Sequence, residues 1–185
     1  MAPPPHPPAL AEALERRPQR IVILGRSGSG KSTLARRLGA ELDLPVVHLD
    51  RLFWQPGWVE ADRETFRARV TEALAGDRWI TDGNFSNSFD LRLPRAELVV
   101  WFEVPRLVCI RRVLGRVWRH YGRARPDLAP GCPERLDWEF LRYIWNFDRD
   151  TRPKIMAGLA EHRAAARVVV VDGARPAPRR AGTSC

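Results

Sequence analysis

The chain has 185 residues, 44% of them hydrophobic and 29% charged, the proportions of a water-soluble globular protein with a buried core. Lys and Arg outnumber Asp and Glu by 31 to 22, and the net charge of +9 favours an anionic ligand or partner. No apolar run approaches the roughly 18 residues that span a bilayer, which argues against a membrane protein, and three scattered cysteines argue against a disulfide framework and favour the cytoplasm.

The first 18 residues predict a disordered leader. Five of the first eight residues are proline, and the apolar core of a signal peptide does not follow them. We expect one folded domain over residues 19–173 and a disordered basic tail over residues 174–185.

A strand, a turn and a helix follow the leader. Residues 21–24 form the continuous apolar run IVIL, which is typical of a strand buried on both faces. Residues 25–30 are rich in Gly and Ser, and residues 31–42 carry leucines at every fourth position, which predicts a helix.

The same alternation continues along the rest of the chain. Further strands are predicted over residues 44–50, 78–83, 96–105 and 167–173. Helices are predicted over residues 61–74, 106–121 and 138–163, the last of them broken near Pro153. The helix over 106–121 is expected to bury one apolar face, made of Leu107, Ile110, Leu114, Val117 and Trp118.

Five strands that alternate with helices predict an α/β fold. The expected architecture is a five-stranded parallel sheet covered by helices on both faces, in three layers. The segment over about residues 120–137 is rich in Pro and Gly, and we expect it to form a short lid.

The turn after the first strand has the full spacing of a Walker A phosphate-binding loop. Its glycines let successive backbone N–H groups point inward, and the following helix directs the positive end of its dipole at the same place. Lys31 is then placed to reach the β- and γ-phosphates of ATP, and the Ser32 hydroxyl to ligate Mg²⁺. The predicted nucleotide-binding residues are Gly25, Arg26, Ser27, Gly28, Ser29, Gly30, Lys31, Ser32 and Thr33.

Two acidic residues end predicted strands. Asp50 and Asp82 should both emerge at the carboxyl edge of the sheet, where ligands of such sheets bind. Asp82 is a candidate for organising Mg²⁺, and Asp50 for a catalytic base or an acceptor-binding group. The alternative is that each aspartate only begins a turn, as Asp-Gly pairs often do.

Arginine supplies 29 of the 31 basic residues, so a single arginine is weak evidence and Lys31 is stronger evidence than usual. Seven arginines lie between Glu103 and Asp127 without an acidic residue among them. Such a run is either a solvated helix face or a set of cations that neutralises transferring phosphate. The candidates for the second role are Arg112, Arg116, Arg149 and Arg152.

Trp54 and Trp58 follow Asp50 closely. They are candidates for binding the acceptor, by stacking or by lining its pocket, and the alternative is that they pack a loop against the core.

The sequence resembles the adenylate-kinase-like group of P-loop kinases. Within that group it is most similar to small bacterial proteins labelled FlaR-like or DNA topology modulation proteins. The resemblance extends from Arg20 to Gly173 and is carried by GRSGSGKST, HLDRLFWQPGW, WITDGNFSNSFDLRL, AELVVWFEVP and DWEFLRYIWNFDRDTRPKI. It implies a P-loop NTPase fold over this domain, with ATP and Mg²⁺ as ligands.

The resemblance also implies roles for single residues. Asp82 would be the acid that organises Mg²⁺, in the place of the Asp-Gly-Phe-Pro-Arg segment of adenylate kinases. Asn84 and Phe85 follow Gly83 here, so the arginine of that segment is missing and Arg92 is the candidate to replace it at the acceptor. This departure puts a nucleoside monophosphate acceptor in doubt.

For the remaining family positions, Arg112 or Arg116 would enter the lid, and Arg149 and Arg152 would close on the phosphates. The loop after residue 173 would lie near the adenine. The lid has one cysteine, Cys132, and lacks the four-cysteine zinc pattern of some relatives.

The expected function is transfer of the γ-phosphoryl group of MgATP to a small acceptor, a nucleotide or nucleoside among the possibilities. Two alternatives stay open: a kinase for 5′-hydroxyl ends of polynucleotides, and an ATP-gated regulatory protein that binds nucleic acid through the basic lid helix. The sequence does not identify the acceptor or the oligomeric state.

Overall fold

The computed structural model describes residues 6–122, 128–162 and 166–173. The predicted tail, the first five residues of the predicted leader and residues 123–127 of the predicted lid lie outside this part of the chain. Among its helices, none has the length and the hydropathy that crossing a bilayer requires.

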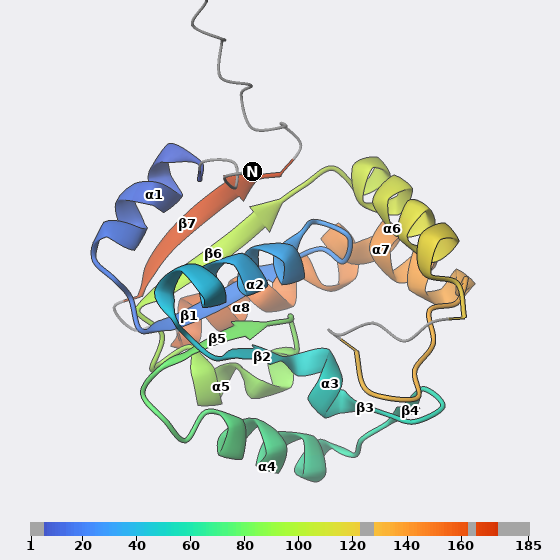
Figure 1. Cartoon of the computed structure of the whole chain (residues 1–185), viewed down its shortest axis with the longest axis horizontal. Coiled ribbons are helices and arrows are strands. Elements are labelled where there is room, and N and C mark those ends of the chain that lie inside the picture. Colours follow the sequence, from blue (N-terminus) through green and yellow to red (C-terminus); the bar gives the residue numbers. More distant parts are fainter. Residues whose placement is uncertain (1–5, 123–127, 163–165, 174–185) are drawn as a thin grey trace, which may run out of the picture.

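Five parallel strands form the main sheet, in the spatial order β2-β5-β1-β6-β7 (Figure 1). Their bounds are β1 Arg20–Gly25, β2 Val46–His48, β5 Trp79–Asp82, β6 Leu98–Glu103 and β7 Arg167–Asp172. The predicted five-stranded parallel α/β fold is confirmed. The central strand β1 is continuously apolar because both of its faces are covered, and residues 21–24 are fully buried.

Helices cover the sheet on both faces and make the fold three-layered. On one face α1, α2 and α6 share a core with β1 and β6, and on the other face α4, α5 and α8 share a second core with the same strands. The helices are α1 Pro8–Glu15, α2 Lys31–Leu42, α3 Leu49–Phe53, α4 Arg63–Ala73, α5 Phe89–Arg92, α6 Arg106–His120, α7 Trp138–Asp150 and α8 Arg152–His162. The predicted break near Pro153 falls at Thr151, between α7 and α8.

The prediction of a disordered leader over residues 1–18 is wrong for residues 8–15, which form α1. Leu10, Ala13 and Leu14 repeat at helical spacing, and all three are buried in the first core. Pro8 does not prevent this, because a proline at the first helical position loses no internal hydrogen bond.

The predicted buried face of α6 is right for Val117 and for the partly buried Ile110, and wrong for Leu107, Leu114 and Trp118. The helix buries Cys109, Val113 and Val117, whereas Trp118 is 87% exposed. The loop between β1 and α2 explains which face of α6 is buried, since a Cβ atom at Gly28 would lie 2.6 Å from the Cys109 carbonyl oxygen. Only a face of smaller side chains lets the helix come so close to this loop. The other exposed apolar residues of α6 are Leu107 and Leu114.

A small antiparallel hairpin follows α3 and was not expected from the sequence. It consists of β3 Trp54–Gln55 and β4 Val59–Glu60, outside the main sheet. The hairpin and α3 fill the connection from β2 to α4 (Figure 1), on the same side of the molecule as the described part of the lid.

Candidate active site

The loop between β1 and α2 has the shape of a phosphate cradle. Gly25, Gly28 and Gly30 have φ angles of 138°, 83° and 109°, which side chains other than glycine rarely allow. Gly30 caps α2 without a side-chain hydrogen bond, so the first N–H groups of the helix remain available at the loop. These are the features that bind anions at a helix N-terminus.

Lys31 begins α2 and lies inside the cradle. Its ammonium donates a hydrogen bond of 2.9 Å to the Arg26 carbonyl oxygen. Burial lowers the pKa of Lys31, while the nearby carboxylates of Asp82 and Asp50 act in the opposite direction. Asp82 ends β5 as predicted, whereas Asp50 does not end a strand: β2 stops at His48, and Asp50 lies in the first turn of α3.

Asp82 is held by a histidine that the sequence analysis did not single out. His48 and Asp82 are register partners on β2 and β5, and the His48 Nδ1 lies 2.9 Å from Asp82 Oδ2. Both residues are buried, and Asp82 Oδ1 has no hydrogen-bond partner. In the sequence, both predicted strands carry polar residues near their carboxyl ends. The sequence does not show the strand register that places His48 beside Asp82.

The residues at this edge fit a magnesium ion. Mg²⁺ takes oxygen ligands and usually binds through one or two protein groups, together with water and substrate phosphates. Asp82 Oδ1 is a buried carboxylate oxygen that lacks a partner, and Ser32, in the first turn of α2, is only partly buried. In the described part of the chain, no group of three or more His, Cys, Asp and Glu side chains converges to hold a metal alone.

Asn84 ties the phosphate loop to the segment after β5. Its amide oxygen accepts from the Gly25 N–H at 3.0 Å, and its amide nitrogen donates to the Gly25 carbonyl oxygen at 3.0 Å. The same nitrogen lies 3.3 Å from the Tyr143 hydroxyl of α7. Asn84, noted in the sequence only as a departure from the family pattern, thus connects three elements of the site.

Of the predicted lid arginines, Arg112 lies against the loop between β1 and α2, and Arg116 is bonded to the lid. Arg112 donates to the carbonyl oxygens of Ser29 at 3.1 Å and Gly173 at 2.7 Å, and so bridges the loop and the end of β7. Arg116 pairs with the buried Glu134 at 3.0 Å, and its charge contributes to the lowered pKa of Lys31.

The other arginines point elsewhere. Arg149 is largely exposed and pairs with Asp150 beside it on α7. Arg152 pairs with Glu103 at 2.8 Å, at the end of β6. The structure therefore does not bring this pair together over the phosphate loop.

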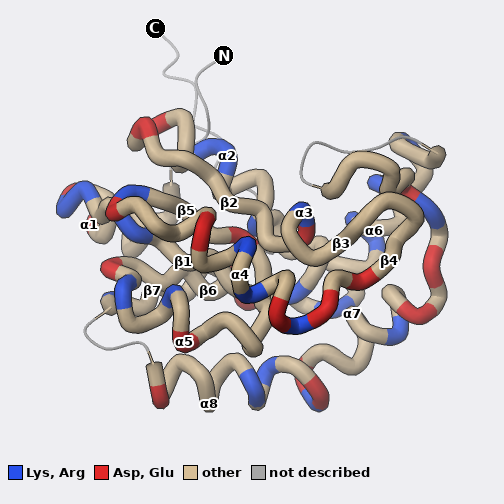
Figure 2. Tube along the Cα trace, turned by 90° about the horizontal axis from the view of Figure 1, so that it is seen from below, with Lys and Arg blue, Asp and Glu red and all other residues tan. Residues whose placement is uncertain are grey.

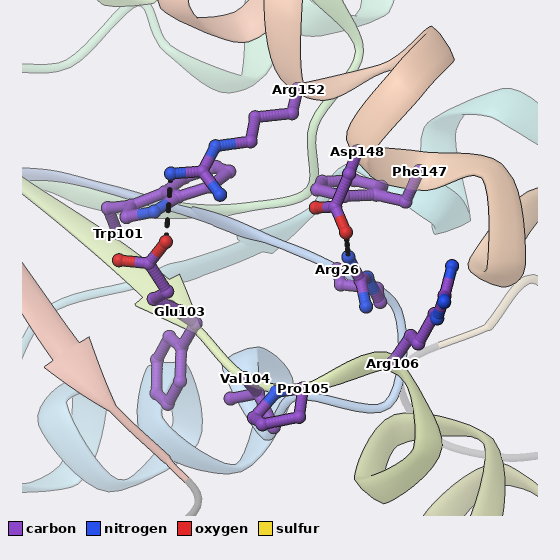
Figure 3. A pocket seen from close by; sticks show the side chains of 10 residues that line it. Arg26, Trp101, Glu103, Val104, Pro105, Arg106, Phe147, Asp148 and Arg152 are labelled. Atoms are coloured by element: carbon purple, nitrogen blue, oxygen red, sulfur yellow. Dashed lines mark ion pairs between the residues drawn. The ribbon is translucent and has the colours of Figure 1, made fainter.

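Arg26 lies in the phosphate loop, but its side chain leaves the cradle. The guanidinium is nearly fully buried, pairs with Asp148 of α7 at 2.5 Å and lies over the ring of Phe147 (Figure 3). With Arg152 and Glu103 these residues line a cavity of about 200 Å³ at the carboxyl end of β6. The predicted nucleotide contact of Arg26 is thus limited here to its backbone.

Arg92 does not reach an acceptor. It is fully buried, and its guanidinium donates to the carbonyl oxygens of Gly83 at 2.9 Å, of Phe85 at 3.3 Å and of Asn84. Burial lowers the pKa of Arg92 to about 9. This arginine holds the segment after β5 in shape, so its predicted contact with the acceptor does not fit its position.

The two predicted acceptor-binding tryptophans lie in the hairpin and pack against each other, with ring centres 5.4 Å apart. Trp58 donates through Nε1 to the Pro133 carbonyl oxygen at 3.1 Å, and the Arg135 guanidinium lies over its ring. The Gly57 N–H donates to the Gly131 carbonyl oxygen at 3.0 Å. These contacts favour the packing alternative: the hairpin holds the described part of the lid.

Comparisons with known proteins find a similar sequence and several similar folds. The chain is 28% identical over 145 residues to adenylate kinase 2 of Nostoc sp. (strain PCC 7120), a match that covers 63% of this chain and 75% of that protein. Among solved structures, a gluconokinase from Sinorhizobium meliloti 1021 matches with a TM-score of 0.50 and 23% identity, over 86% of this chain and 85% of that one. A shikimate kinase from Bacteroides thetaiotaomicron matches with a TM-score of 0.48 and 20% identity, over 84% and 87% of the two chains. No protein-family model matches the chain.

The gluconokinase match shows that the two chains share a fold. The sequence match supports the resemblance at the level of adenylate-kinase-like P-loop kinases. Neither finding bears on the FlaR-like subgroup, which stays a prediction.

Proposed function

We propose that the protein is a phosphotransferase that transfers the γ-phosphoryl group of MgATP to a hydroxyl group of a small acceptor. The observation that carries the proposal is the arrangement at the edge of the sheet. A buried lysine at the start of α2 lies near the carboxylate of Asp82 at the end of β5, which has an oxygen without a partner, and near that of Asp50 in the first turn of α3. The similarity to an adenylate kinase supports the same class of reaction.

Each residue has a distinct task in this scheme. The backbone of residues 25–30 and the first turn of α2 bind the phosphates, and Lys31 exchanges the Arg26 carbonyl oxygen for phosphate oxygens. Ser32 and Asp82 hold Mg²⁺, which neutralises charge on the phosphates when it is bound. Asp50 accepts the proton of the acceptor hydroxyl, and Arg116 stabilises the charge that develops during transfer.

Production of ADP from MgATP tests the proposal. The acceptor panel contains nucleoside monophosphates, nucleosides, small sugars and 5′-hydroxyl oligonucleotides, and we expect one class to stimulate turnover. Lys31→Ala should abolish this activity without unfolding the protein. The chain has only one other lysine, the exposed Lys154, and Lys154→Ala is therefore the matched control. Full turnover by Lys31→Ala would refute the proposal.

Asp82→Asn separates catalysis from binding. The amide keeps the size of the carboxylate but removes the charge that Mg²⁺ requires. We expect turnover to fall by at least about 100-fold, while binding of ADP without metal changes little. Unchanged turnover would reduce Asp82 to a structural residue at the end of β5.

A specific observation favours a second candidate, in which the acceptor is the 5′ end of a single-stranded nucleic acid. The outer faces of α6 and α7 expose Trp118 and Trp138, at 87% and 75%, on helices that carry several arginines. Exposed aromatic and arginine side chains together suit stacked bases and backbone phosphates. Basic residues are nonetheless spread over the whole molecule and interleaved with acidic ones (Figure 2), and the small acceptor is preferred.

The two candidates differ in their response to salt. If oligonucleotides bind at α6 and α7, their affinity should fall steeply between 50 and 200 mM salt, and Trp118→Ala should weaken it without affecting ADP binding. Activity with nucleosides or sugars that changes little with salt would favour the small acceptor.

A further inference from the structure

We propose that His48 is a positioning residue, which orients the Asp82 carboxylate so that one of its oxygens faces the magnesium ion of the bound nucleotide. The inference rests on the proposed function. It adds a residue that neither the sequence motifs nor the comparisons assign, and it gives that residue a role distinct from those of Lys31 and Ser32.

The register of the sheet places His48 beside Asp82. Asp82 ends β5, with Ile23 of β1 as its register partner on one side and His48 of β2 on the other. Ile23 is fully buried and apolar, so it offers the carboxylate no donor. His48 offers its imidazole on the other side, and Nδ1 lies 2.9 Å from Asp82 Oδ2.

The chemistry of the pair fixes the direction of the bond. An ionised carboxylate only accepts hydrogen bonds, so Nδ1 of His48 must carry the proton and donate it. Both side chains are less than 10% exposed, and water does not replace this donor easily. Burial of the pair therefore holds the imidazole in one place.

A carboxylate held through one oxygen presents the other in a defined direction. The terminal torsion of aspartate is broad and two-fold, so an unrestrained carboxylate samples many orientations. The bond from His48 occupies Oδ2 and leaves Oδ1 as a buried oxygen without a partner. Lys31 does not compete for Oδ1 in this structure, because its ammonium is bonded to the Arg26 carbonyl oxygen.

Three substitutions separate this role from simple packing. His48→Asn keeps a donor nitrogen near the place of Nδ1, His48→Gln moves the donor one bond further out, and His48→Leu removes it at similar volume. If His48 orients Asp82, the Asn variant should resemble the wild type and the other two should both lose metal affinity. A purely structural role predicts no rescue by Asn.

Thermal unfolding with ADP alone and with ADP plus Mg²⁺ gives a readout that does not depend on activity. We expect the same shift with ADP alone in all four proteins, because the phosphate loop is unchanged. The additional shift caused by Mg²⁺ should require about tenfold more metal in the Leu and Gln variants, and less than threefold more in the Asn variant. In turnover assays the Leu and Gln variants should need more Mg²⁺ for half-maximal activity. Their kcat at saturating Mg²⁺ should be closer to the wild-type value than their activity at low Mg²⁺.

Three outcomes would overturn the proposal. The first is an unchanged response of His48→Leu to Mg²⁺, and the second is equal loss in the Asn and Leu variants. Should His48→Leu fail to fold, the comparison of Asn with Gln decides in the same way. The third is a wild-type protein whose thermal stability does not rise with ADP alone. This result would refute nucleotide binding itself, and the measurement with ADP alone therefore distinguishes it from the other two outcomes.

Discussion

Replacement of Asn84 by alanine tests the connection between the phosphate loop and the segment after β5. The wild-type side chain satisfies both backbone groups of Gly25, at 3.0 Å each, and contacts the Tyr143 hydroxyl. Gly25 is buried, so water cannot fully replace the missing amide. Asn84→Ala therefore leaves one donor and one acceptor without partners at the start of the loop.

The magnitude follows from these two groups. Leaving a buried polar group without its partner costs about 1–3 kcal/mol, and Asn84 is itself only partly buried, which favours the lower half of that range. We expect the free energy of unfolding to fall by about 2–4 kcal/mol, which in a domain of this size lowers Tm by roughly 5–15 °C. The affinity for ADP should fall as well, because Gly25 begins the loop that we propose to bind the phosphates.

Urea unfolding followed by circular dichroism measures the loss of stability, and calorimetric titration measures the affinity for ADP. Tyr143→Phe is the control: it removes the third, longer contact of Asn84 together with the hydrogen bond of the Tyr143 hydroxyl to Thr151, and should leave both bonds to Gly25 and the affinity for ADP intact. A loss below about 0.5 kcal/mol for Asn84→Ala, with unchanged ADP affinity, would refute the reasoning.

Three further predictions concern other parts of the molecule. Leu10→Ala should lower the free energy of unfolding by about 2–5 kcal/mol in urea titrations, because Leu10 is fully buried; a loss below about 1 kcal/mol would mean that α1 is not packed on the sheet. Burial lowers the pKa of Lys31, and binding of the phosphates requires its charged form. The affinity for ADP should therefore weaken as the pH rises, and this loss should begin below the ordinary lysine pKa of 10.5. Titrations at several pH values check this, and Lys31→Ala should abolish the effect. Trp58→Phe should speed tryptic cleavage after Arg135 several-fold, since the bond from Nε1 to the Pro133 carbonyl oxygen is lost; an unchanged cleavage rate would show that the hairpin does not hold the lid.

The sheet could be predicted because its strands are short apolar runs buried on both faces, and such runs are recognisable without knowledge of their neighbours. The buried faces of the helices were harder to predict. In α6 both possible faces are apolar, and the close approach of Gly28 to the Cys109 carbonyl oxygen selects the one with smaller side chains. A contact of that kind joins residues about 80 positions apart and leaves no local pattern.

The turn between β1 and α2 could be predicted for a similar reason, since its glycine spacing is local and the positive φ angles of these glycines follow from it. His48 and Asn84 could not. Each acts through a partner on another element, Asp82 in the first case and Gly25 in the second, and those pairs depend on strand register and loop conformation. The sequence shows that two strands end in polar residues, but not which of these residues meet.

The roles of the arginines could not be predicted from the local sequence. A guanidinium has five N–H donors and no acceptor of its own, so its role is decided by the oxygens that the fold places around it. Arg92 donates hydrogen bonds to backbone carbonyl oxygens and stabilises the segment after β5, whereas Arg152 forms an ion pair with Glu103 at the end of β6. Arg116 pairs with the buried carboxylate of Glu134 at 3.0 Å, and its role at the transferring phosphate stays a proposal. In a chain where arginine is the usual cation, the acceptor that the fold places beside each guanidinium is better evidence for its role than its position in the sequence.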